Sequence, residues 1–142
     1  MERSLVLIKP DAVQRGLTGT ILSRLENDGL KLIALKMLQM DRSLAARHYA
    51  VHVEKPFFSG LIDYITSGPI VAAVFEGNEA VSQIRKLMGA TDPRKAAKGT
   101  VRGDLGIDIE KNSVHGSDSP ETARDEIVLF FSGSEIVDYQ RG

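Results

Sequence analysis

"KNSVHGSDSPETARDE", residues 111–126, is the stretch that decides the fold, because it contains the last strand and the start of the last helix. Residues 112–116 are typical of a short strand that ends at a glycine. Ser119 is placed as a helix N-cap, where its hydroxyl can accept a hydrogen bond from an amide of the first turn. Pro120 suits the first helical position, and Glu121 complements the positive end of the helix. The stretch therefore predicts a strand, a polar turn and a helix.

The sequence before this stretch alternates between apolar runs of strand length and segments with helical spacing. Including the one above, strands are expected at residues 3–9, 30–40, 69–77 and 112–116. Further helices are expected at residues 17–29, 43–52, 57–68 and 78–89, the last with Asn78 as its cap. A long irregular segment, about residues 90–111, precedes the last strand. Loops of that length in a compact domain are usually functional or disordered.

This order of elements predicts the fold class. Without the two middle helices and the final helix, it is the β-α-β-β-α-β pattern of ferredoxin-like folds. We therefore expect one α+β domain over residues 1–142, with a four-stranded antiparallel sheet and helices packed on its faces. The strand at 30–40 is apolar on most positions of both faces, so it should be either central or an edge covered by a partner chain.

Composition and charge exclude several classes of protein. The chain has 142 residues, a formal net charge of −1 and no cysteine. No overall field favours nucleic acid or an anionic membrane, and disulfides and thiolate metal sites are excluded. The N-terminal apolar run, Leu5–Ile8, is too short for a signal peptide, and no run approaches the roughly 20 apolar residues that span a bilayer. We expect a cytoplasmic protein without a membrane partner.

Charge is nevertheless uneven along the chain. Residues 85–102 contain six Lys and Arg against one Asp, and residues 104–126 contain seven Asp and Glu against two Lys and Arg. The sequence has neither a Walker A motif nor the motifs of protein kinases, so bound phosphates would need side-chain cations. Guanidinium groups suit phosphate because their forked donors bind bidentately. The candidate cations are Lys9, Arg85, Arg94, Lys95, Lys98 and Arg102.

The histidines differ in context. His48 and His52 are four residues apart on an expected helix, but no third metal ligand is evident, and we expect both on the surface. His115 lies at the end of a strand, and its neutral form is available at pH 7. Ser117 and Glu126 could orient its ring, which is the arrangement of an activated nucleophile. A surface histidine in a capped turn would explain the same residues.

A resemblance favours the nucleophile. "NSVHGSDS", residues 112–119, closely resembles the N-x-x-H-G-S-D signature of nucleoside diphosphate kinases. Other segments resemble that family in order and spacing over nearly the whole chain: "LIKPDAVQRGLTGTIL", "HYAVHVEKPFF", "SGPIVAAVFEG", "RKLMGATDP" and "GTVRGDL". The resemblance implies transfer of the terminal phosphate of a nucleoside triphosphate, mainly ATP, to nucleoside diphosphates. It also implies a ping-pong mechanism through a phosphohistidine at Nδ1 of His115, with Mg²⁺ bound through the nucleotide phosphates.

The resemblance also assigns roles to other residues, position by position. Lys9 and Asn112 should hold the sugar, and Lys9 should also meet phosphate. Arg85, Thr91 and Arg102 should hold phosphates, and Tyr49 should lie near the transferred one. The base should lie among Phe57, Leu61 and Ile109. Ser117 and Glu126 should support His115 from behind.

Assembly and alternatives complete the expectations. The family implies a homo-tetramer or homo-hexamer built from dimers, and the strand at 30–40 is the expected dimer contact. Asp92 and Lys98 stand where many relatives have Asn and Pro, within a loop associated with subunit contacts. The alternatives are a ferredoxin-like regulatory or binding module without turnover and a histidine phosphocarrier for protein partners. Nucleic-acid binding is not expected, because the chain is close to neutral.

Overall fold

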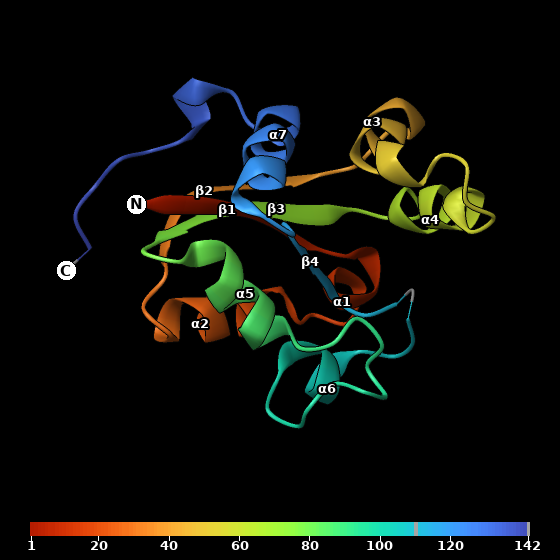
Figure 1. Ribbon diagram of the computed structural model, residues 1–142, viewed down its shortest axis with the longest axis horizontal. Helices are drawn as coiled ribbons and strands as arrows, with labels where there is room; N and C mark the ends of the chain where they lie inside the picture. Colours follow the sequence, from red (N-terminus) through yellow and green to blue (C-terminus); the bar gives the residue numbers. More distant parts are fainter. Residues whose placement is uncertain (110, 142) are drawn as a thin grey trace.

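A four-stranded antiparallel sheet forms the centre of the computed structural model, which describes residues 1–109 and 111–141. The predicted domain also includes Glu110 and Gly142, which lie outside the described residues. The sheet order is β2-β3-β1-β4 and every neighbouring pair is antiparallel. This order confirms the expected ferredoxin-like fold (Figure 1). The strands are β1 (Glu2–Ile8), β2 (Lys31–Leu38), β3 (Ile70–Gly77) and β4 (Val114–Gly116).

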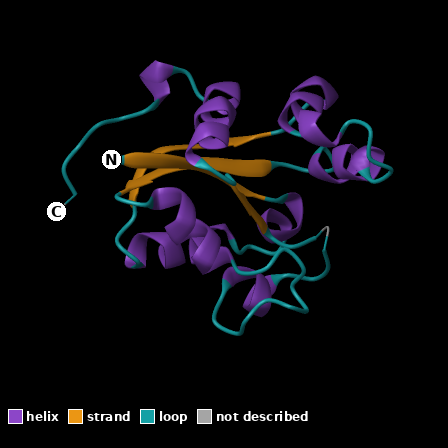
Figure 2. Ribbon diagram, in the orientation of Figure 1, coloured by secondary structure: helices purple, strands orange, loops and turns teal. Residues whose placement is uncertain are grey.

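Helices cover both faces of the sheet, as Figure 2 shows. Below the sheet in Figure 1 lie α2 (Thr18–Asn27) and α5 (Ala80–Met88). Above it lie α3 (Arg42–His48) and α7 (Pro120–Phe130), and α4 (Phe58–Ile65) packs into the same core cluster.

The two faces share the central strands. In β1, Leu5 and Leu7 belong to the cluster under α3, α4 and α7, whereas Val6 and Ile8 belong to the cluster under α2 and α5. Successive side chains of a strand point to opposite faces, so one apolar run can serve both cores. All of β3 is buried for the same reason.

The last helix begins as the sequence predicts. The Ser119 hydroxyl accepts from the Thr122 amide at 3.1 Å, and the Thr122 hydroxyl accepts from the Ser119 amide at 3.0 Å. Pro120 occupies the first helical position. These reciprocal bonds hold the turn between β4 and α7.

Other expectations need correction. Asn78 is not a cap, because α5 begins after Glu79 and has no side-chain cap. The segment expected to be irregular contains α6 (Val101–Leu105), which is capped by Thr100. A short helix that was not expected, α1 (Pro10–Gln14), follows β1, since proline lacks an amide hydrogen and suits a first turn. The described ranges also contain the 3₁₀ turns η1 (Ala50–His52) and η2 (Gly133–Glu135).

The strand β2 lies at an edge of the sheet, which answers the question that its sequence left open. The C-terminal segment runs beside the start of this strand: the Val137 amide donates to the Ile33 carbonyl at 2.9 Å. Farther along β2, Leu35 is 50% exposed and Met37 is 62% exposed. Among the described residues, no helix is long and apolar enough to cross a membrane.

Candidate active site

His115 lies in β4, where its Cα pairs with that of Leu7 in β1. Its Nε2 is 3.2 Å from each carboxylate oxygen of Glu126, which comes from α7. The Ser117 hydroxyl donates to Oε1 of Glu126 at 2.6 Å. The carboxylate is therefore held from one side and engages one ring nitrogen of His115. The other ring nitrogen, Nδ1, is left for a substrate.

The charge of Glu126 is maintained by its neighbours. Burial alone would raise the pKa of this carboxyl group. Hydrogen bonding and charge interaction with His115, and the hydroxyl of Ser117, outweigh burial and lower the pKa below its ordinary value. A charged Glu126 favours a proton on Nε2 of His115, because Nε2–H can then donate to it. That tautomer leaves the lone pair on Nδ1, the nitrogen that can act as a nucleophile.

A cleft of about 660 Å³ opens in front of His115. It brings together residues from both cores, and with one exception it contains every predicted site residue. The exception is Ser117, which is fully buried behind Glu126. The predicted residues that line the cleft are Lys9, Tyr49, Phe57, Leu61, Arg85, Thr91, Arg102, Ile109, Asn112, His115 and Glu126.

Lys9 and Asn112 form the polar floor of the cleft. The Lys9 ammonium donates to Oδ1 of Asn112 at 2.9 Å, and the Asn112 amide donates to the carbonyls of Thr91 (3.0 Å) and Ile109 (3.2 Å). The Lys9 backbone amide also donates to the Ser113 carbonyl at 2.9 Å. Ser113 has a φ of 76°, a rare conformation for a residue with a side chain. The backbone between Asn112 and His115 is therefore held in a strained form, as is common at functional sites.

Arg102 is a buried cation at the phosphate end. Its two terminal nitrogens donate to the carbonyls of Gly89 (3.1 Å) and Val114 (2.8 Å). Its Nε is buried and, among the described residues, has no hydrogen-bond partner. Burial, together with the nearby Arg85, lowers the pKa of Arg102 to about 10. A buried guanidinium without a carboxylate partner is a strong site for an anion.

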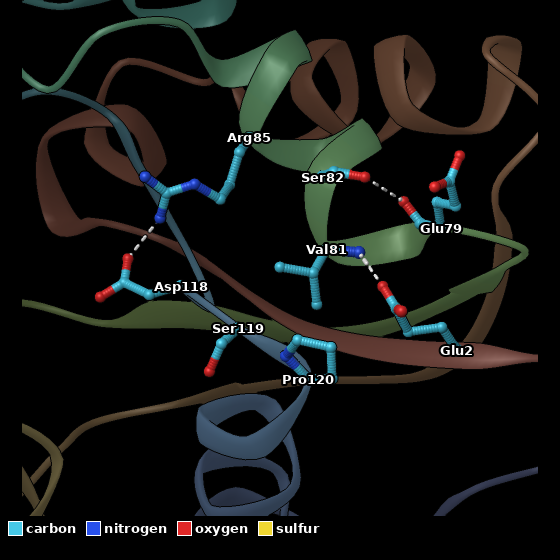
Figure 3. A pocket seen from close by; sticks show the side chains of 8 residues that line it. All are labelled: Glu2, Glu79, Val81, Ser82, Arg85, Asp118, Ser119 and Pro120. Atoms are coloured by element: carbon cyan, nitrogen blue, oxygen red, sulfur yellow. Dashed lines mark hydrogen bonds and ion pairs between the residues drawn. The ribbon is translucent and has the colours of Figure 1, made fainter.

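Arg85 has a different environment, because it is half exposed and paired. Its Nη1 is 2.5 Å from Oδ1 of Asp118 (Figure 3). Figure 3 views this ion pair from a second, shallower pocket of about 450 Å³, which also contains Ser82 and Pro120. Arg85 and Asp118 line both pockets, so their ion pair forms part of the wall between them.

The other end of the cleft is apolar. Phe57 is 50% exposed and Ile109 is 59% exposed, and both line the cleft with Leu61. His52 lies beside Phe57, with ring centroids 5.4 Å apart. Exposed apolar side chains that gather at a cleft mark a binding surface. This end suits a flat, apolar ring.

The expectation of surface histidines was wrong. The side chain of His48 is only 1% exposed, and its ring packs edge-on against His115 with centroids 4.7 Å apart. Burial and the nearby His115 lower the pKa of His48 to about 3, so the ring is neutral at pH 7. His52 is half-buried and also lines the cleft. The one available signal was spacing: Ala45 and His48, three residues apart, lie on the buried face of α3.

The basic segment, residues 85–102, brings fewer cations to the cleft than its composition indicates. Of the six candidate cations, Lys9, Arg85 and Arg102 line the cleft. Arg94 instead pairs with Asp92 at 3.0 Å. Sequence reasoning did not assign five further lining residues: Val51, Met88, Gly89, Ala90 and Gly116. Asp118 also lines the cleft; sequence reasoning left two interpretations of it, a turn residue or a residue that acts on Mg²⁺ through water.

Comparisons with known proteins agree with this geometry. The profile of the nucleoside diphosphate kinase family matches residues 2–136. A nucleoside diphosphate kinase of Dehalococcoides mccartyi is 67% identical over 99% of both chains, and one of Archaeoglobus fulgidus is 57% identical over 99% of this chain and 93% of its own. Among solved structures, a halophilic nucleoside diphosphate kinase of Halobacterium salinarum in complex with CDP matches with a TM-score of 0.96. It is 52% identical over 99% of this chain and 93% of its own.

Proposed function

This chain belongs to the nucleoside diphosphate kinase family and transfers phosphate between nucleotides, and on that premise we propose that the transfer runs through a phosphohistidine on His115. The observation that carries the proposal is the contact of Nε2 with both oxygens of Glu126 at 3.2 Å. That contact orients the ring and reserves the lone pair of Nδ1. The alternative, a regulatory or binding module without turnover, is not favoured, since relatives of high identity are named as the kinase.

The reaction has two mirror-image halves. Nδ1 of His115 attacks the terminal phosphorus of a nucleoside triphosphate; a P–N bond forms, the bridging P–O bond breaks and the diphosphate leaves. The positive charge on the ring is stabilised by Nε2–H donation to Glu126. A second nucleoside diphosphate then attacks the phosphorus, and the histidine is regenerated. Such transfer requires mainly positioning and charge neutralisation, which Arg102, Arg85 and Lys9 can supply.

Mg²⁺ enters, in this proposal, as part of the substrate. Among the described lining residues, the carboxylates are Asp118 and Glu126. Glu126 is engaged by His115 and Ser117, and Asp118 is paired with Arg85. This donor set fits an ion that is bound through nucleotide phosphates and waters rather than by a carboxylate cage.

Substrate breadth follows from the apolar end of the cleft. Phe57 and Ile109 present faces without directional hydrogen-bonding groups, and every base has a π-face to stack. We propose that purine and pyrimidine nucleotides are both accepted. From the sequence we also propose that the chain forms a homo-tetramer or homo-hexamer built from dimers. The proposed location is cytoplasmic.

The test is the intermediate itself. Incubation with Mg-ATP should add one phosphoryl group to the intact protein, labile in acid, stable in base and lost on addition of a nucleoside diphosphate. His115→Ala should abolish labelling and turnover together. His52→Ala, which removes another imidazole of the same cleft, should still become labelled. Phosphate found on Ser117 or Ser119 instead would overturn the proposal.

A further inference from the structure

Three side chains from three separate elements meet on the Nε2 side of the His115 ring, opposite the nucleophilic Nδ1. They are His48 from α3, His115 itself from β4 and Glu126 from α7. Each provides one ligand atom, and these atoms all lie within 4.8 Å of one another. Nε2 of His115 is 3.2 Å from Glu126, and Nδ1 of His48 is 3.7 Å from Oε2 of Glu126. Two imidazole nitrogens and a carboxylate oxygen therefore surround one point.

His48 is unexplained by the phosphotransfer reaction. Both of its ring nitrogens are buried, and neither has a hydrogen-bond partner among the described residues. Its side chain is 1% exposed and lines the cleft. A buried polar group without a partner is unfavourable unless a ligand satisfies it. The separation of 3.7 Å from Glu126 is too long for a hydrogen bond, but an ion between the two groups would bridge it.

We propose that His48, His115 and Glu126 form a binding site for a borderline-soft divalent cation of the Zn²⁺ class, and that this ion inhibits phosphotransfer. Two histidines, a carboxylate and a fourth position open to the cleft are a known ligand set for zinc. Bonds of about 2.0–2.2 Å place the ligands of a tetrahedral site about 3.3–3.6 Å apart. The two separations from Glu126, 3.2 and 3.7 Å, are close to this range, and all three ligand atoms lie within 4.8 Å of one another, so side-chain shifts that draw the two rings together complete the site.

The site discriminates between metal ions. Nitrogen ligands suit Zn²⁺, Co²⁺ and Cu²⁺, whereas Mg²⁺ prefers oxygen and keeps its waters. Mg²⁺ carried by nucleotide phosphates would therefore not occupy this position. The nucleotide cation and the inhibitory cation are distinct in this proposal.

Inhibition follows from the tautomer of His115 and rests on the proposed function. An ion on Nε2 takes the lone pair there, and the proton that Nε2 carried moves through water to Nδ1 of the same ring. Nδ1–H has no lone pair for phosphorus. The ion also occupies Glu126, which can no longer support the ring. A metal at this site therefore removes the nucleophile without entering the part of the cleft that holds the nucleotide.

Co²⁺ is the probe for the site, because its visible absorption reports coordination. Nucleotide-free protein should bind one Co²⁺ per chain and show the intense bands of a four- or five-coordinate ion. His48→Gln should abolish the bands and weaken binding by at least about tenfold, since even outer-shell partners of metal ligands are worth about 10- to 100-fold in affinity. His115→Ala should also abolish them. His52→Gln, the matched control, lies in the same cleft but outside the trio and should keep the bands.

A second experiment tests inhibition. It measures labelling of the protein by Mg-ATP while Zn²⁺ is added in excess of the amount that the nucleotide chelates. Zn²⁺ should reduce labelling of the natural protein, and His48→Gln should resist this reduction. Absent bands in the natural protein, or bands that persist in His48→Gln, would overturn the site. Bound Zn²⁺ with unchanged labelling would overturn the inhibition. If the protein takes no label even without Zn²⁺, the proposed function fails, while the Co²⁺ spectrum still decides the metal site.

Discussion

The two arginines that line the cleft differ in how well their positive charges are compensated before a substrate binds. Arg85 is half exposed and already paired with Asp118, so it must exchange one anion for another. Arg102 is buried against two carbonyls, and its lowered pKa, about 10, reflects an uncompensated charge. A phosphate would compensate that charge. Arg102 should therefore contribute more than Arg85 to binding the transferring phosphoryl group.

Arg102→Ala should consequently reduce the rate of phosphoenzyme formation strongly. Losing one preorganised contact to transition-state charge reduces rates by about 10²- to 10³-fold. Glu126→Gln should reduce the rate less, because the amide oxygen can still accept from Nε2–H. Single-turnover labelling by ATP at saturation measures both, with circular dichroism as the control for folding. A folded Glu126→Gln protein as inactive as His115→Ala would show that Glu126 transfers a proton directly.

At the scale of elements, β2 is the segment whose environment is incomplete in a single chain. The C-terminal segment donates hydrogen bonds to three backbone carbonyls at the start of this strand. Arg141 donates to Leu30, the Tyr139 hydroxyl to Leu32 and the Val137 amide to Ile33. Leu35 and Met37, two residues apart, are left half exposed or more. An apolar edge strand is a template for pairing with another chain. A second copy of this chain, placed across a two-fold axis, would cover it.

We therefore expect a dimer or a larger assembly in solution at micromolar concentration, and Leu35→Lys combined with Met37→Glu should favour the monomer. Burial of charges in an apolar contact is unfavourable, so the loss of assembly should be complete at low concentration. Light scattering measures the mass. Val128→Glu is the matched control, since Val128 is 74% exposed and lies on α7 rather than on β2, and should leave the assembly intact. A stable monomer of the natural chain would contradict the expectation.

At the scale of the whole molecule, an ion-pair group links three strands at the end of the sheet where β1 begins. Glu76 of β3 contacts Arg3 of β1 at 3.0 Å and Lys31 of β2 at 3.3 Å. The hydrogen bond from Arg3, with help from Lys31, lowers the pKa of Glu76 below its ordinary 4.5, although burial opposes this. A group whose pKa is lowered by folding stabilises the folded state most above its unfolded pKa.

This linkage predicts how stability depends on pH. The contribution of Glu76 should be complete above pH 4.5 and should be lost as the pH falls through the lowered pKa, because the unfolded chain then binds the proton more readily. Glu76→Gln should lower the thermal midpoint near neutral pH and flatten its decline in acid. Midpoints measured from pH 6 downward for both proteins test this. Parallel curves would show that the ion pairs contribute nothing to acid sensitivity.

Much of the site was predictable because its signals are local. Ser119 caps α7 by accepting a hydrogen bond from Thr122, three positions away. His115 and Glu126 are separated only by the turn after β4 and the first two turns of α7, so their spacing is also set locally. The element order alone yields the fold class, since the connections between these strands leave few topologies. Capping, turn geometry and strand alternation depend on neighbours within a few residues, so the sequence by itself determined them.

Tertiary structure decided the features that depend on distant segments. The spacing of Ala45 and His48 marks one face of α3, but what covers His48 is Phe130 and Glu126 of α7, more than 70 residues away in the sequence. Among the described residues, Arg102 has no carboxylate partner, and its guanidinium donates to the carbonyls of Gly89 and Val114. The edge position of β2 follows from the pairing of β1 with both β3 and β4. Burial, and the charge state that follows from it, is a property of packed elements and not of any one of them.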